Sequence, residues 1–227
     1  MDFRPTESQQ LIAQTVRDFA DKHIRPDMME WDESQRFPIE VFKKLGELGL
    51  MGVLVPEKYN GAGLSYFEYV TAIQELARVC GSVGLSMAAH NSLCTGHIMT
   101  FGNEEQKEKY LKKLASGEVI GAFCLSEPEA GSDATSQHTT AEEKEDYYLL
   151  NGTKNWITNG GISSVCLVIA QTHPELKHRG INCLIVEKGW DGFVVGKKED
   201  KMGIRASDTH SLMFSDVKVP KENRIGA

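Results

Sequence analysis

Residues 123–133 read FCLSEPEAGSD, and residues 151–159 read NGTKNWITN. The first stretch passes from an apolar run into a turn of Pro, Gly, Ser and Asp, where backbone N–H groups can face a ligand. The second opens with Asn-Gly, the strongest short signal for a β-hairpin, and places Trp156 two residues before Thr158 on one strand face. Together they predict a flat aromatic wall and hydrogen-bond donors suited to a large planar cofactor.

The sequence before this region has helical periodicity. The segments that begin at Thr6 and Ser65 fit capping boxes, and Asn103 is a third N-cap. Pro38 and Gly49 fit the start and the end of another helix. Residues 82–101 are apolar almost all round, which is typical of a helix in the middle of a bundle. We therefore predict an all-α helical bundle over residues 1–118.

After residue 118 the pattern changes from helical to extended. Short β-rich runs are separated by Gly, Pro, Asn and Asp, with polar loops expected at residues 137–146 and 173–180. The predicted strands are residues 119–125, 147–150, 153–158, 165–172, 181–187, 192–196 and 212–219. So many short strands predict a small antiparallel β-barrel or sandwich over residues 119–227. The expected fold class is thus a multidomain α+β protein.

Charge and composition exclude several classes of protein. The chain has 227 residues, with 25 Lys and Arg against 32 Asp and Glu and a net charge of -7. Because the basic residues are scattered, a nucleic-acid surface is not expected. No apolar run approaches the roughly 18 residues of a membrane span, and residues 1–5 lead into a polar helix start without an apolar leader.

The cysteine and histidine patterns do not indicate a metal site. The five cysteines are an odd count without C-x-x-C spacing, and they lie in apolar stretches. They are typical of small buried thiols in a reducing compartment. The seven histidines are not paired at ligand spacing.

Four further motifs complete the pattern. They are VPEKYNGAG at residues 55–63, FGNEEQK at 101–107, MGIRASDT at 202–209 and FSDVKVP at 214–220. With the two central stretches, and in this order, they resemble the acyl-CoA dehydrogenase family over the whole chain, and its short-chain or butyryl-CoA members in particular. These flavoenzymes introduce a double bond between the α and β carbons of an acyl-CoA thioester.

The resemblance implies FAD as the cofactor. Backbone groups near Leu125 and Ser126 would meet the pyrimidine edge of the isoalloxazine ring, and Ser132 would contact the pyrophosphate and the approaching thioester. Trp156 would pack against the ring, and Thr158 would hydrogen-bond near the reactive N5. The full set of implied cofactor residues is Phe123, Leu125, Ser126, Gly131, Ser132, Trp156, Ile157 and Thr158.

His90 and Asn91 have two interpretations. Inside an apolar helix, polar side chains are usually satisfied by hydrogen bonds in the core. Alternatively, the segment resembles short- and branched-chain family members, which implies that Met87, His90, Asn91 and Leu93 wall an acyl pocket together with Ser132. No residue of this chain is assigned as the catalytic base. The resemblance implies that the base is a glutamate beyond Ala227, in a C-terminal helical domain that this chain lacks.

The expected activity is FAD-dependent α,β-dehydrogenation of a short-chain, or branched short-chain, acyl-CoA. By resemblance, the electrons would pass to an electron-transferring flavoprotein, and the full-length enzyme would be a homotetramer. The expected compartment is a bacterial cytoplasm or a mitochondrial matrix. Two alternatives stay open: an acyl-CoA oxidase or flavin monooxygenase that uses oxygen, and a truncated, non-catalytic binding module.

Overall fold

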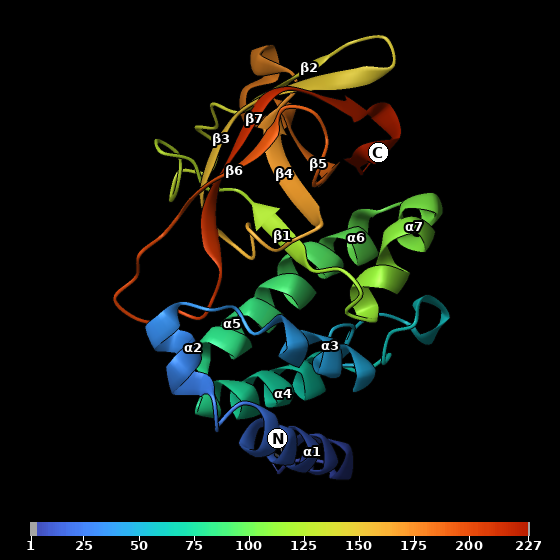
Figure 1. The fold of residues 1–227 in the computed structure, drawn as a ribbon. Helices are drawn as coiled ribbons and strands as arrows, with labels where there is room; N and C mark the ends of the chain where they lie inside the picture. Colours follow the sequence, from blue (N-terminus) through green and yellow to red (C-terminus); the bar gives the residue numbers. More distant parts are fainter. Residues whose placement is uncertain (1–3, 227) are drawn as a thin grey trace.

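The computed structural model describes residues 4–226, and the first three residues and Ala227 lie outside the described part. Helices form one end of the molecule and a twisted sheet forms the other (Figure 1). The helices are α1 (Glu7–His23), α2 (Met28–Ser34), α3 (Ile39–Glu47), α4 (Tyr66–Val79), α5 (Gly81–Ala88), α6 (Gly96–Phe101) and α7 (Glu104–Ala115). The π-helix η2 (Ala89–Thr95) joins α5 to α6 into one run, and the short 3₁₀ helix η1 (Glu57–Tyr59) precedes α4.

The helix starts follow from side-chain caps. Complete capping boxes begin α1 at Thr6, α4 at Ser65 and α7 at Asn103. In each box the first side chain accepts a backbone N–H bond while the side chain three residues later reaches back, so two otherwise unpaired donors are satisfied. Helix α2 had no such signal in the sequence. It is held instead by Trp31, whose ring is buried in the helical core.

The second half is a mixed sheet of eight strands. The strands are β1 (Gly121–Cys124), β2 (Thr140–Glu143), β3 (Tyr147–Thr158), β4 (Val165–Gln171), β5 (Ile181–Glu187), β6 (Phe193–Lys198), β7 (Thr209–Pro220) and β8 (Arg224–Ile225). Their order is β6-β7-β3-β2-β4-β5-β8, with β1 paired to β4 off this path. This arrangement confirms the α+β fold class. The sheet is open and not purely antiparallel, because β4 pairs in parallel with both β1 and β2.

The hairpin expected at Asn151 and Gly152 is wrong. Strand β3 runs straight through these residues and stays paired with β7, with a change of register between Leu150 and Gly152. Gly152 has φ 149°, and a Cβ there would lie 2.7 Å from the Cα of Thr139, so glycine serves a close approach and not a turn. The actual hairpin joins β2 to β3, and β2 lies within the segment that was expected to be a polar loop.

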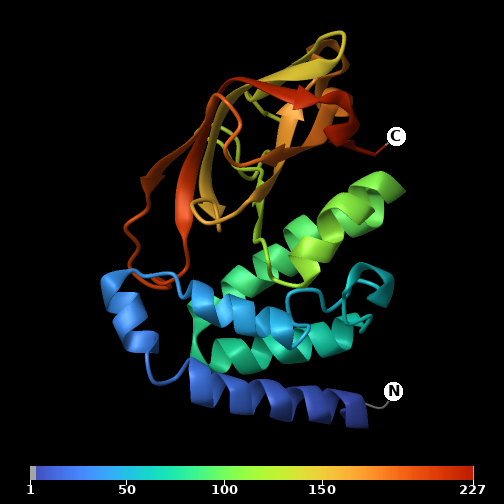
Figure 2. The same cartoon turned by 45° about the vertical axis from the view of Figure 1, so that its right-hand side comes forward.

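The helices and the sheet share a core. The shared cluster takes Cys94, Ile98 and Leu114 from the helices and Leu167 and Ile185 from the sheet. Figure 2 shows the end of the helical run and α7 beneath the strands. Because this contact is apolar and buried, it fixes the two halves against each other.

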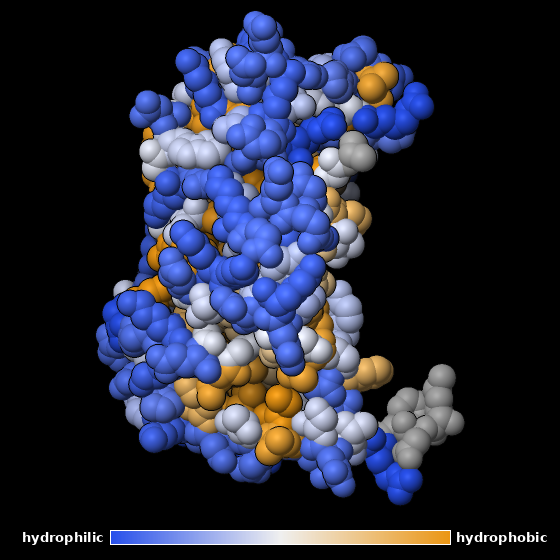
Figure 3. Space-filling view, turned by 90° about the vertical axis from the view of Figure 1, so that its right-hand side faces the viewer, coloured by the Kyte–Doolittle hydropathy of each residue, from blue (hydrophilic) through white to orange (hydrophobic). Residues whose placement is uncertain are grey.

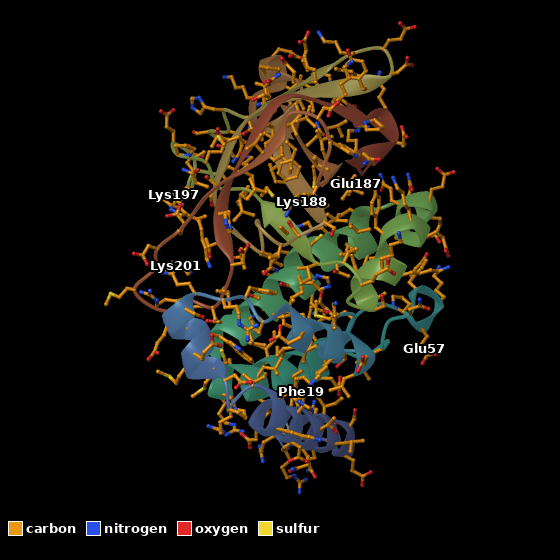
Figure 4. All side chains as sticks on the ribbon, viewed as in Figure 1. Phe19, Glu57, Glu187, Lys188, Lys197 and Lys201 are labelled. Atoms are coloured by element: carbon orange, nitrogen blue, oxygen red, sulfur yellow. The ribbon has the colours of Figure 1, made fainter. Side chains whose placement is uncertain are left out.

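Polar contacts at the edge of this junction add to the apolar ones. Glu187, labelled in Figure 4, lies above α7. Its carboxylate accepts a 2.7 Å hydrogen bond from the Tyr110 hydroxyl and pairs with Lys109 at 2.9 Å. The end of β5 is thus tied directly to α7.

The outer surface differs between the two halves. Figure 3 shows hydrophobic residues gathered over the lower, helical part of the face that it presents, whereas the upper part is mostly polar. Within residues 4–226, no helix has the length and apolar character needed to cross a membrane.

Candidate functional site

A cavity of about 270 Å³ lies where η2 meets the ends of β1 and β3. Its wall combines apolar side chains with short polar ones and contains no titratable group. The lining residues are Ala89, Leu93, Phe123, Leu125, Ser126, Trp156, Ile157 and Thr158. All of them except Ala89 were predicted from the sequence as cofactor or substrate residues. The fold therefore brings together side chains from three segments that lie far apart in the chain.

Trp156 has an unusual backbone conformation. Its φ is 59°, in the left-handed region that a bulky residue rarely occupies, and this strain costs on the order of 1–3 kcal/mol. The strand has a β-bulge here, between Lys154 and Ile157 in its pairing with β7. The bulge turns the indole outward, and 61% of the residue is exposed. A large aromatic ring held outward by a strained backbone indicates a surface prepared for a flat ligand.

The segment that directly follows β1 has hydrogen-bond donors on the same wall. The Leu125 carbonyl accepts a 3.0 Å bond from the Lys154 ammonium, and the Ser126 carbonyl accepts a 2.8 Å bond from the Asn155 N–H. Among the described residues, neither the N–H nor the hydroxyl of Ser126 has a partner, and the Thr158 hydroxyl has none either. The acceptors of this segment are thus engaged by β3, while donors remain available at the cavity.

The geometry fits the ring of a flavin. The cavity offers an indole face and unpaired donors to a planar ring with a polar rim, and its volume is near the lower end of ligand pockets, about 300–1,000 Å³. It would hold a ring system and a small substrate group but not a whole dinucleotide. The rest of such a cofactor would have to lie along the surface.

Comparison with known proteins agrees with this geometry. Residues 6–118 match the model of the acyl-CoA dehydrogenase N-terminal domain, and residues 122–217 match that of the acyl-CoA dehydrogenase middle domain. The chain belongs to the acyl-CoA dehydrogenase family.

Individual family members are closely similar. The chain is 47% identical to the short-chain specific acyl-CoA dehydrogenase of Clostridium acetobutylicum, covering 100% of this chain and 60% of that protein. It superposes on butyryl-CoA dehydrogenase from Megasphaera elsdenii with a TM-score of 0.97 at 42% identity, covering 100% of this chain and 60% of that one. A structure from work on the electron transferring flavoprotein of Acidaminococcus fermentans gives a TM-score of 0.98 at 44% identity, with the same coverage. The chain thus spans about 60% of the length of these relatives.

The structure separates the four predicted acyl-pocket residues of this family member. Leu93 lines the cavity, but Met87, His90 and Asn91 are buried in the helical half and are absent from its lining. The Asn91 amide donates to the carbonyls of Leu50 and Met87 and accepts from the Val53 N–H. Such complete pairing fits the alternative interpretation, in which these residues are polar members of the core.

His90 is equally engaged. Its Nδ1 accepts a 3.0 Å bond from the Gly121 N–H, and its Nε2–H points to the carbonyls of Met51 and Leu114 at 3.0 and 3.1 Å. Burial lowers the pKa of His90 from 6.5 to about 4, although the two carbonyls act against this shift. The neutral imidazole therefore joins the helical half to the first residue of β1.

Gly131 and Ser132 lie in an exposed turn outside the cavity. They follow residues 127–130, where the Glu127 N–H donates to the Ala130 carbonyl at 2.8 Å, and they precede Asp133, whose carboxylate accepts from the Thr135 N–H and the Ser136 hydroxyl. A Cβ added at Gly131 would meet nothing within 4 Å. Their contact with the cofactor pyrophosphate stays a prediction.

Ala89 is the cavity residue that the sequence reasoning missed. Ala89 and Leu93 lie four residues apart in the π-helix η2 and both line the cavity, whereas Met87, His90 and Asn91 are buried and do not line it. Helical spacing alone does not separate the two groups, because His90 and Leu93 are three residues apart. The prediction grouped the four residues by similarity to the family and not by helical face.

Proposed function

We propose that this chain provides the N-terminal and middle parts of an FAD-dependent short-chain acyl-CoA dehydrogenase. The observation that carries the proposal is the outward, strained Trp156 beside the unpaired donors of Ser126 and Thr158. An apolar patch from Ala89 and Leu93 completes the same cavity. The similarity to short-chain and butyryl-CoA dehydrogenases supports the substrate class.

When bound, FAD supplies the chemistry of the reaction by accepting a hydride from the β carbon of the substrate. Trp156 would cover one face of the ring and limit the access of water. The Ser126 N–H would donate to the polar edge of the ring, and the Thr158 hydroxyl would donate near its reactive centre. Since these donors belong to strand ends that the sheet already holds, they need little reorganisation when the charge on the ring changes.

The acyl chain lies against Ala89 and Leu93. An apolar wall of two small or medium side chains, in a cavity of about 270 Å³, favours a short acyl group over a long one. A proton must also leave the α carbon, and this needs a base in a dry pocket. The lining of the cavity contains no carboxylate or imidazole. We assign the base, by family resemblance, to a glutamate of the C-terminal helical domain.

Partner, assembly and location are parts of the same proposal. The electron acceptor is an electron-transferring flavoprotein, supported by the similarity to the structure from Acidaminococcus fermentans. The full-length enzyme assembles as a homotetramer, as the family resemblance implies. The protein works in a reducing compartment, a bacterial cytoplasm or a mitochondrial matrix, because all five cysteines are free thiols and four of them are buried.

The test is the visible absorption spectrum of the purified full-length protein. A flavin band that bleaches when butyryl-CoA is added without oxygen, and returns slowly in air, supports a dehydrogenase. Fast reoxidation with formation of peroxide indicates an oxidase or monooxygenase instead. Flavin binding without bleaching by any short acyl-CoA indicates a non-catalytic binding module. If the protein binds no FAD, the proposal is refuted.

A further inference from the structure

A buried ion pair lies directly behind the cavity wall. The side chain of Lys154 on β3 is 0% exposed and that of Glu127 is 2% exposed, and the Lys154 Nζ donates to the Glu127 carboxylate at 2.6 Å. The same ammonium donates to the Leu125 carbonyl at 3.0 Å and to the Gln137 side-chain oxygen. All three ammonium protons are therefore used.

The Glu127 carboxylate is equally occupied. One oxygen accepts a 2.6 Å bond from the His138 N–H, and the other accepts from the Thr139 N–H at 3.1 Å. Burial opposes ionisation of this carboxyl, but the bonds from Lys154, Thr139 and His138 outweigh it and lower its pKa. The pKa of Lys154 is lowered too, in its case by burial, and the nearby Glu127 carboxylate partly offsets this shift. A lysine with three acceptors and a carboxylate with three donors remain an ion pair.

The position of this pair is not explained by stability. Burying two charges costs several kcal/mol of desolvation, and well-packed apolar residues often stabilise a fold as well or better. The pair instead joins both ends of one loop, residues 125–139, to β3. That loop carries Ser126 at the cavity and Gly131 and Ser132 at the surface. The lysine itself lies two residues before Trp156, on the strand that carries the bulge.

We propose that Lys154 and Glu127 form a positioning element for FAD. The ammonium fixes the Leu125 carbonyl inward, so that the next N–H, that of Ser126, stays directed to the cavity at a set distance from Trp156. The carboxylate fixes the far end of the same loop. Neither residue lines the cavity, so they act through the segments they hold. This inference rests on the proposed function, since it concerns the binding of the same cofactor.

The double variant K154M/E127Q separates positioning from stability. It removes both charges together, so no unpaired charge stays buried, and the single oxygen of the glutamine can still accept one of the two N–H bonds that the carboxylate accepts from His138 and Thr139. We expect a melting temperature close to wild type but a dissociation constant for FAD at least tenfold higher, measured by flavin fluorescence on the reconstituted protein. In the protein without FAD, amide hydrogen exchange at residues 125–127 should be faster than in wild type. The single variant E127Q leaves the Lys154 ammonium buried without its charge partner, so it should lower the melting temperature more than the double variant does.

The matched control is Asn223→Leu. Asn223 is buried and bonds to the Ile185 carbonyl and the Tyr110 hydroxyl, away from the cavity. This variant should lower the melting temperature and leave FAD affinity unchanged. If K154M/E127Q binds FAD as wild type does, or if its amides at residues 125–127 exchange no faster than those of wild type, the positioning role is wrong. If wild type itself binds no FAD, the proposed function fails instead, so the two failures are distinct.

Discussion

Acid should destabilise this protein through one histidine. His90 is fully buried, and its Nδ1 accepts a bond from the Gly121 N–H. A second proton on the ring would therefore oppose that N–H as well as place a charge in the core. The pKa of His90 is lowered from 6.5 to about 4, so the folded state binds this proton less readily than the unfolded chain does.

The loss of stability in acid depends on the difference in proton binding between the folded and the unfolded state. The free energy of unfolding that comes from keeping His90 neutral is fully present above pH 6.5 and is lost as the pH falls towards 4. With these two values the loss is about 2 kcal/mol at pH 5 and about 3 kcal/mol at pH 4. That is a large part of the total stability of an ordinary domain, about 5–15 kcal/mol.

Urea unfolding at several pH values from 7.5 to 4 measures this loss. Carboxylates also titrate near the lower limit, so the informative quantity is the difference in unfolding free energy between wild type and His90→Gln. Glutamine does not titrate and keeps a donor and an acceptor. The difference should be greatest at pH 7.5 and shrink by about 2 kcal/mol at pH 5. A difference that stays constant over this range would refute the reasoning.

Three further predictions concern the cavity and its support. Gly121→Ala should cost about 1–3 kcal/mol of unfolding free energy, because the new Cβ would lie 2.7 Å from the Cβ of Cys94, whereas Gly131→Ala, facing open space, should leave the melting temperature unchanged. Trp156→Ala should weaken FAD binding at least tenfold in a fluorescence titration while unfolding free energy changes by less than about 0.5 kcal/mol, since the side chain is exposed. Leu93→Ala should raise kcat/KM for an acyl-CoA one methylene longer by about fourfold relative to butyryl-CoA, which corresponds to about 0.8 kcal/mol; unchanged ratios would place the acyl chain elsewhere.

Local signals predicted the helices well. A capping box depends on two residues three positions apart, and Pro or Gly marks the start or the end of a helix by itself. Both signals can be recognised from a short stretch of sequence. Helix α2 was missed because its stability comes from the burial of Trp31 and not from a cap. The seven-residue π-helix η2 likewise has no sequence signature of its own. The domain division after residue 118 stays a prediction.

The strands show where sequence reasoning reaches its limit. Ile181–Glu187 was predicted with its observed bounds, because it is a compact apolar run. In β3, strict alternation would place Lys154 and Trp156 on the same face. The bulge between Lys154 and Ile157 breaks that alternation, so the lysine lies buried while the tryptophan faces out. A bulge is set by the pairing with β7, and nothing within β3 alone reveals it.

The same bulge explains why the cavity needs support from both sides. The left-handed backbone conformation of Trp156 is strained, and such strain persists only where the surrounding structure holds it. On the sheet side, Lys154 and Glu127 bind the loop that carries Ser126. On the helical side, His90 bonds the first residue of β1, the strand that leads to Ser126. Since both supports converge on one short segment, loosening either should weaken the cofactor site, and in a fluorescence titration the effects of acid and of the charge-free variant K154M/E127Q on FAD affinity should not be additive.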